Sequence, residues 1–227
     1  MSTLSGPIRA KGYWHINVRP AEYLGGRVTY SSLRSILDRC VVQLRGWDFP
    51  HLDRRGGDQR GNTWIGGQTD WDQYKEAWRF YQSGQFVYQL GIHEDGIGGT
   101  FPPNRLTPGV AGIGVGDVLF RITETYEFAS RLSVTEAGGD EMHIAIDIRN
   151  LVGRRLYVDD INRMPMDHDY SFSEPALHWK VTVSRAALAG TSRDLAVDAA
   201  SEVFARFGWH PPRAMLLEQQ SQLRWPK

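Results

Sequence analysis

Hydrophobic and polar residues alternate along several stretches of the chain, a pattern that is typical of half-buried β-strands. In the first stretch Trp14, Ile16 and Val18 fall on one side of the chain. Residues 155–158 are predicted to be a short hairpin partner of the strand at 141–149. The predicted strands cover residues 12–20, 86–93, 141–149 and 177–184.

Apolar residues at spacings of three and four positions predict five helices. The first helix carries the chain's single cysteine, Cys40, in its apolar stripe, so we expect this thiol to be a core residue rather than a nucleophile. The second helix begins at Asp70, ends at Gly84 and carries an aromatic stripe. These rings are expected in the core, and a stacking platform for bases or a ligand is the alternative. The predicted helices cover residues 33–44, 70–84, 117–134 and 192–207, and the last begins after Pro212.

Strands joined as hairpins, with helices gathered between them, indicate an α+β fold in which about five helices pack on a mainly antiparallel sheet. A chain of 227 residues is long enough for one large domain. We predict a single domain over residues 1–227, with a subdivision near 95–116 as the alternative. Two glycine-rich connections, 45–68 and 95–116, are expected to carry function, because such long loops are uncommon inside compact domains.

Composition and charge narrow the class of protein. Basic and acidic side chains number 26 each, and a neutral chain argues against charge-driven wrapping of nucleic acid or of an anionic membrane. A single cysteine excludes an internal disulfide and a cysteine-based zinc site. The sequence contains neither a membrane-spanning apolar run nor a signal-peptide pattern at its start. We therefore expect a cytoplasmic protein without membrane contact.

Sequence motifs for several common reactions are missing. The glycine-rich run at 109–116 lacks the lysine of a phosphate-binding loop, and no Gly-x-Ser-x-Gly turn for acyl transfer is present. Asp167, His168 and Asp169 are the densest group of metal-ligand types, but three consecutive polar residues are more typical of a solvated turn. We therefore expect no cofactor and no metal site.

The clearest catalytic candidate lies on the polar side of the predicted C-terminal sheet. His143 and Asp147 are four residues apart on one strand and so share a face, and His178 lies on the 177–184 strand. If these strands are neighbours, the three side chains could form the acid–base site of a hydrolase or nuclease. The alternative is an ordinary polar sheet face that is wet or covered by a helix.

The segment from Arg45 to His51 is the most unusual local string. A rigid loop that displays its aromatic residues would bind a partner or a flat ligand. The alternative is that Trp47 and Phe49 plug the core beside an Arg45–Asp48 pair. Two arginines that follow add a local basic patch through which nucleic acid could bind. The predicted ligand- or partner-binding residues are Arg45, Trp47, Asp48, His51, Arg54 and Arg55.

Several strings of residues together carry a resemblance to a known group of proteins. They are Gly-Tyr-Trp at 12–14 with Arg19-Pro20, then the strings at 44–51, 77–86 and 204–212. These strings resemble a bacterial domain found in the C-terminal part of DNA-binding proteins of the Schlafen/AlbA-like group. The resemblance covers most of the chain and implies a role beside nucleic-acid or phage-defence machinery. It implies no catalytic residue.

Three functional hypotheses follow from these observations. The first is a non-enzymatic interaction or sensor domain that presents the 45–51 segment, the following glycine-rich loop and the 70–84 helix to a partner. A protein partner is expected, and nucleic acid is the alternative. The second hypothesis is a hydrolase or nuclease that uses His143, Asp147 and His178. The third is a homo-oligomeric structural subunit whose aromatic helix lies in an interface.

Overall fold

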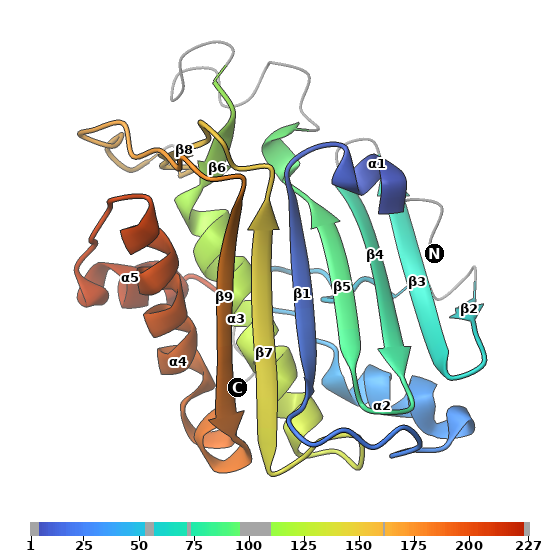
Figure 1. The fold of residues 1–227 in the computed structure, drawn as a ribbon. Helices are drawn as coiled ribbons and strands as arrows, with labels where there is room; N and C mark the ends of the chain where they lie inside the picture. Colours follow the sequence, from blue (N-terminus) through green and yellow to red (C-terminus); the bar gives the residue numbers. More distant parts are fainter. Residues whose placement is uncertain (1–4, 53–56, 72–73, 96–109, 161, 225–227) are drawn as a thin grey trace.

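A seven-stranded antiparallel sheet forms the centre of the computed structural model (Figure 1). The structure describes residues 5–52, 57–71, 74–95, 110–160 and 162–224. The strands follow one another across the sheet in the order β2 (Gln59–Arg60), β3 (Trp64–Trp71), β4 (Tyr74–Tyr81), β5 (Phe86–Gly91), β1 (Tyr13–Pro20), β7 (Glu141–Arg149) and β9 (Ala176–Ser184).

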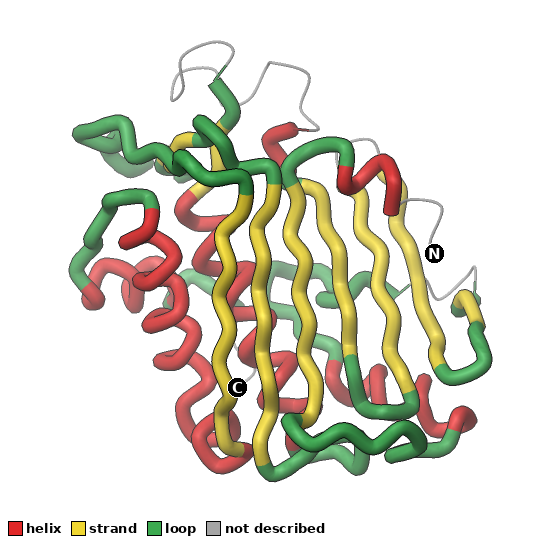
Figure 2. Tube along the Cα trace, viewed as in Figure 1, coloured by secondary structure: helices red, strands yellow, loops and turns green. Residues whose placement is uncertain are grey.

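Helices cover one face of this sheet, and its other face is open except where α1 crosses it (Figure 2). The short helix α1 lies against β4 and β5 on the open face. The α+β prediction, with about five helices on a mainly antiparallel sheet, is confirmed. The helices in the described residues are α1 (Ser5–Arg9), α2 (Leu33–Cys40), α3 (Val115–Ser133), α4 (Arg185–Arg206) and α5 (Arg213–Gln220).

The alternating strands bury one side against the helices, as the sequence pattern requires. In β1 the side chains of Trp14, Ile16 and Val18 are fully buried, and each fully buried side chain of this kind contributes about 1.5–3 kcal/mol. A large cluster of buried hydrophobic residues extends from Trp14 to Leu223, and a small second cluster joins Ile8 to Ala77. Cys40 belongs to the large cluster, and burial raises the pKa of its thiol to about 12, as expected for a core residue.

The predicted helix over residues 70–84 is wrong, because this segment forms the end of β3 and the strand β4. The register pairs Trp71 with Tyr74, so the two strands form a hairpin. The aromatic residues fit a period of two as well as a helical period: Trp78 and Phe80 are buried on one side, and Arg79 between them points to the other. Aromatic residues favour strands, and pairing on both sides of β4 decides between the two periods.

The predicted hairpin between residues 141–149 and 155–158 is also wrong. β7 is already hydrogen-bonded on both edges, to β1 and to β9. The segment Arg155–Tyr157 forms β8, which pairs in parallel with β6 (Gly112–Gly114) as a separate two-stranded sheet. Parallel partners need a long crossover, and here the crossover includes α3 and β7.

Two helices differ most from their predicted bounds. The first helix ends at Cys40 rather than at residue 44, because Val42 pairs with Phe49 instead of continuing the helix. The helix predicted to begin at Ser192 forms the second part of α4. The first part begins at Arg185, where the Ser184 hydroxyl accepts the Ala187 N–H at 3.2 Å, and the backbone of Thr191 between the two parts is not helical (φ −139°, ψ 25°).

Candidate functional site

An aromatic pocket opens beside the end of the β3–β4 hairpin. Its walls are Trp47, His51, Trp71 and Tyr74, and its volume is about 250 Å³. Trp47 is 48% exposed and Trp71 is 58% exposed. The His51 ring meets Trp71 edge-on at a centroid distance of 4.7 Å, and Trp71 lies 6.2 Å from Tyr74. Exposed aromatic residues that gather around one concave site indicate binding.

A short closed loop displays Trp47 in the wall of the aromatic pocket. Val42 and Phe49 exchange two backbone hydrogen bonds, at 2.9 and 2.8 Å, which close the loop. Phe49 is buried, with its ring centre 4.9 Å from that of Tyr88. Gly46 has a φ of +88°, a conformation that favours glycine. The sequence left open whether both aromatic residues of this segment enter the core, and the structure buries Phe49 and exposes Trp47.

The buried carboxylate of Glu76 holds two walls of the pocket. Its Oε1 accepts the backbone N–H of His51 at 2.8 Å, and its Oε2 accepts the hydroxyls of Tyr74 at 2.6 Å and Tyr88 at 2.7 Å. Burial raises the pKa of Glu76 to about 7, although the tyrosine hydrogen bonds and the charge of Arg121 act in the opposite direction. The carboxyl group next to the pocket therefore changes its charge near neutral pH.

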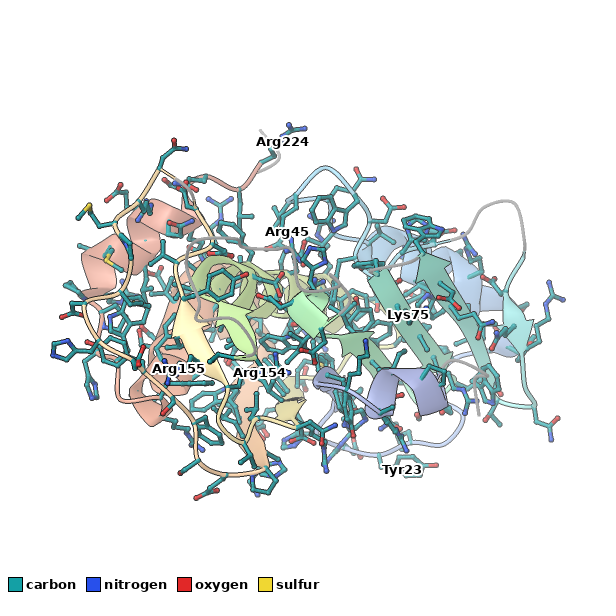
Figure 3. All side chains as sticks on the ribbon, turned by 90° about the horizontal axis from the view of Figure 1, so that it is seen from above. Tyr23, Arg45, Lys75, Arg154, Arg155 and Arg224 are labelled. Atoms are coloured by element: carbon teal, nitrogen blue, oxygen red, sulfur yellow. The ribbon has the colours of Figure 1, made fainter. Side chains whose placement is uncertain are left out.

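Arg45 is buried beside the pocket and is paired inside the protein. Its guanidinium donates hydrogen bonds to both oxygens of Glu124, at 2.9 and 2.7 Å, and to Asp117 at 2.8 Å. Only 12% of the Arg45 side chain is exposed, and the Glu124 side chain is fully buried. The guanidinium also lies 5.1 Å from the ring centre of Trp47, on the side of the sheet opposite to α1 (Figure 3). We interpret Arg45 as a residue that supports Trp47 rather than as a ligand contact.

Carboxylates outnumber guanidiniums in the buried cluster next to the pocket. Besides Arg45, the cluster contains Arg121, which lies 3.6 Å from Asp117 and 3.4 Å from Glu124. The charge of Arg121 also acts on Glu76. Three carboxylates therefore share two guanidiniums, and one negative charge is in excess when Glu76 is ionised.

Carboxylates also anchor the described part of the second glycine-rich connection. Glu94 accepts the backbone N–H of Gly114 at 2.7 Å and the hydroxyl of Tyr157 at 2.8 Å. Burial raises the pKa of Glu94 to about 7, and the charge of Asp117 adds to this effect. This glycine-rich segment therefore binds a carboxylate of the protein itself. When Glu94 is ionised, it adds a negative charge beside Asp117. Residues 96–109 lie outside the described residues.

The predicted binding residues separate into different places. Trp47 and His51 line the pocket, whereas Arg45 is an internal ion-pair partner. Asp48 accepts a hydrogen bond from Gln43 at 2.5 Å, and Arg45 takes Glu124 and Asp117 as its partners. The remaining two predicted residues, Arg54 and Arg55, lie outside the described residues. Trp71 and Tyr74 were not among the predicted binding residues. The 70–84 segment that contains them was expected to face a partner as a helix, and this conformation does not place them beside Trp47 and His51.

The structure brings Asp147 and His178 together on the open face of the sheet. The two residues are paired across β7 and β9, and His178 Nδ1 lies 2.7 Å from Asp147 Oδ1. The other imidazole at Asp147 is His15 on β1, whose Nδ1 lies 3.5 Å from Asp147 Oδ2, and Arg149 donates a hydrogen bond at 3.0 Å. Burial acts to raise the pKa of Asp147, but these hydrogen bonds outweigh it and hold the pKa below its usual value.

His143 does not join this group, so the structure does not assemble the predicted set of His143, Asp147 and His178. A separation of four residues along a strand spans about 13 Å. His143 Nδ1 instead lies 3.3 Å from the Thr182 hydroxyl. Desolvation and the charges of Arg19 and Lys180 lower the pKa of His143.

The described ranges, 5–52, 57–71, 74–95, 110–160 and 162–224, also bear on two other expectations, a metal site and membrane contact. Within them, no group of three or more His, Cys, Asp or Glu side chains is arranged to hold a metal ion. Asp167 and His168 are both highly exposed, and their side chains lie 3.7 Å apart. The helices in these ranges are all too short or too polar to cross a membrane.

Comparisons with known proteins found no match: no family model, no curated protein and no solved structure is similar to this chain. The resemblance to the Schlafen/AlbA-like group therefore stays a prediction.

Proposed function

We propose that this protein is a non-enzymatic interaction domain whose aromatic pocket receives a cationic side chain of a protein partner. One observation carries the proposal: Trp47 and Trp71, from separate parts of the chain, are both largely exposed and line the same pocket. Burying such rings against a partner would remove a large apolar area from water. Tryptophan is also among the residues that most often dominate the energy of protein interfaces.

The charge of the surroundings supports a cation as the group that enters the pocket. The faces of aromatic rings carry partial negative charge and attract ammonium and guanidinium groups. When Glu76 is ionised, the carboxylates of Glu76, Glu124 and Asp117 beside the pocket have only two guanidiniums to balance them. A neutral group would gain from the rings alone, whereas a cation would gain from the rings and from this excess negative charge.

The two alternative functions have weaker support. A hydrolase or nuclease would need its acid–base groups to converge in a cleft, but the His178 side chain is 60% exposed and His143 lies elsewhere on the face. A homo-oligomer was expected to use the aromatic residues of the 70–84 segment. Trp78 and Phe80 of that segment are buried in the core and are not available to an interface, and Trp71 is the tryptophan of the segment that remains exposed.

The proposal is tested by titrating the protein with short peptides in an isothermal calorimeter. Four peptides differ in one residue, which is lysine, trimethyl-lysine, arginine or the uncharged norleucine. The variants are Trp47→Ala and Trp71→Ala, and the control is Tyr23→Ala, which removes another exposed aromatic side chain, 75% exposed and away from the pocket.

We expect saturable binding of at least one cationic peptide. Each tryptophan substitution should weaken it by about 10-fold or more, because aromatic contacts with a desolvated cation contribute up to about 2 kcal/mol. Tyr23→Ala should bind like the unchanged protein. The proposal is wrong if no cationic peptide binds, or if both tryptophan variants bind as tightly as the control.

A further inference from the structure

A second pocket lies on the opposite face of β4, between α1 and the open side of the sheet. Its volume is about 150 Å³, the volume of roughly five water molecules in the liquid. None of the residues that line it carries a carboxylate. We call it the cationic pocket, and its polar lining consists of Ser5, Arg9, His15, Arg79, Tyr81 and Gln89.

The two arginines of the cationic pocket lack the internal partners that Arg45 has. Neither Arg9 nor Arg79 forms a side-chain hydrogen bond or an ion pair with any described residue. The Arg79 guanidinium lies over the ring of Trp64, 4.1 Å from its centre. Stacking fixes the plane of the guanidinium and leaves the N–H groups at its edge free to donate.

Neutral donors surround these charges. The Ser5 hydroxyl donates to Gln89 Oε1 at 2.9 Å, which fixes the side-chain amide of Gln89. The Gln89 amide NH₂ group makes no hydrogen bond within the described residues and remains available to an acceptor. Nδ1 of His15 faces Asp147, so Nε2 is the ring nitrogen left for the pocket, and it donates to an anion there only in the imidazolium form. Two unpaired guanidiniums and the Gln89 amide thus converge in a pocket whose lining contains no acidic side chain.

From this arrangement we propose that the cationic pocket binds the phosphate group of a phosphate monoester. Arginine forks match the oxygens of a phosphate in pairs, and hydrogen bonds between two charged groups are the strongest that side chains form. A monoester carries close to two negative charges at neutral pH, which suits two unpaired guanidiniums better than the single charge of a diester does. The volume admits a phosphoryl group, and any organic part of the ligand would lie outside on the open sheet face.

The proposal is independent of the aromatic pocket. The two pockets share no lining residue, because successive residues of β4 point to opposite faces of the sheet. Either proposal can therefore fail while the other stands.

The experiment is a calorimetric titration at low ionic strength with three probes: inorganic phosphate, adenosine 5′-monophosphate and the oligonucleotide (dT)10. The variants are Arg9→Gln and Arg79→Gln. Arg79→Lys is added to keep the charge while changing the geometry. The matched control is Arg19→Gln, an arginine of β1 that donates to the carbonyls of Pro20 and Ala21 and does not line the pocket.

We expect saturable binding of inorganic phosphate, of the mononucleotide or of both. Arg9→Gln and Arg79→Gln should each weaken it about 10-fold or more, Arg79→Lys by less, and Arg19→Gln not at all. Tighter binding of the mononucleotide than of inorganic phosphate identifies the source as a phosphorylated organic ligand, and equal binding identifies free phosphate. The proposal is overturned if neither phosphate probe saturates, if only (dT)10 binds, or if the Arg19→Gln control loses as much affinity as the pocket variants.

Discussion

The two pockets of this protein lie on opposite faces of one strand, and they treat arginine in opposite ways. Beside the aromatic pocket, Arg45 makes three hydrogen bonds to buried carboxylates. In the cationic pocket, Arg9 and Arg79 make no ion pair with any described residue. A buried arginine needs partners because an unpaired buried charge is costly, whereas an arginine at a binding surface keeps its donors for a ligand. An arginine that is paired with buried carboxylates therefore supports the structure, whereas an arginine without an ion-pair partner at a pocket is available to bind a ligand.

The strongest test of this contrast is Arg45→Ala. Removing the guanidinium leaves the fully buried Glu124 without its main partner, and breaking a buried ion pair costs about 3–5 kcal/mol. Arg9→Ala removes an unpaired, exposed arginine and should change the free energy of unfolding by less than about 0.5 kcal/mol. Urea unfolding measures both. If Arg45→Ala does not fold, Arg45→Lys replaces it, and a loss for Arg45→Lys no larger than that for Arg9→Ala would refute the assignment.

The pH dependence of stability tests the acidic side of the aromatic pocket. Glu76 binds its proton more tightly in the folded protein, where its pKa is about 7, than in the unfolded chain, where it is 4.5. The titration of Glu76 should therefore lower the free energy of unfolding by roughly 3 kcal/mol as the pH rises from about 4.5 to about 7. Above about pH 7 it should cause no further change. Glu94 contributes in the same direction.

The matched variant for this prediction is Glu76→Gln, which removes the titration and keeps the volume. Its unfolding free energy, measured in urea at several pH values, should fall less steeply between these limits, and Glu94 and Asp159, whose pKa values burial also raises, contribute to the remaining slope. An unchanged slope in Glu76→Gln would show that the carboxyl group is not the one that titrates.

A smaller effect is expected from Tyr74→Phe, which removes a hydroxyl that donates to Glu76 at 2.6 Å. Loss of one partner of a buried acceptor costs about 1–3 kcal/mol. The hydrogen bond from Tyr74 favours the ionised carboxylate, so the pKa of Glu76 should rise further in the variant. Carbon-13 NMR of the Glu76 carboxyl group follows this titration directly. A lower pKa in Tyr74→Phe would contradict the hydrogen-bond assignment.

The smallest effect is expected on the open face, from His178→Ala. The His178 side chain is 60% exposed, and such ion pairs contribute about 0–1 kcal/mol. The substitution should leave the unfolding free energy nearly unchanged, and binding in both pockets should be unaffected because His178 lines neither. A loss of several kcal/mol in urea unfolding would show that the open face is part of the stabilising structure.

The strands that alternate strictly could be predicted from the sequence, but the β3–β4 hairpin could not. In β1 and β7 the apolar residues fit a period of two and no helical period, so the prediction is unambiguous. Residues 74–81 contain so many aromatic side chains that both periods fit, and only pairing with β3 and β5 selects the strand. Two of the four residues that line the aromatic pocket, Trp71 and Tyr74, lie on this hairpin. The helix prediction therefore did not place them beside Trp47 and His51.

The order of the strands explains the other errors about the site. Sequence reasoning brought Asp147 and His178 onto one face, and the structure agrees. It missed His15 because β1, the first strand of the chain, lies between β5 and β7, and no local signal indicates that position. The cationic pocket escaped notice for the same reason, since Arg9, His15 and Arg79 come from separate elements that meet only in the folded sheet.

The most direct test of the central claim is an NMR titration that follows the indole N–H signals of the tryptophans with choline and with its uncharged isostere 3,3-dimethylbutan-1-ol. The account predicts that choline shifts the signals of Trp47 and Trp71 together, with one dissociation constant, while that of the buried Trp14 stays in place. The uncharged isostere should bind about 10-fold more weakly, because it lacks the attraction of a cation to the rings and to the carboxylates behind them. Equal binding of the two molecules, or no shift at Trp47 and Trp71, would contradict the claim that this pocket recognises a cation.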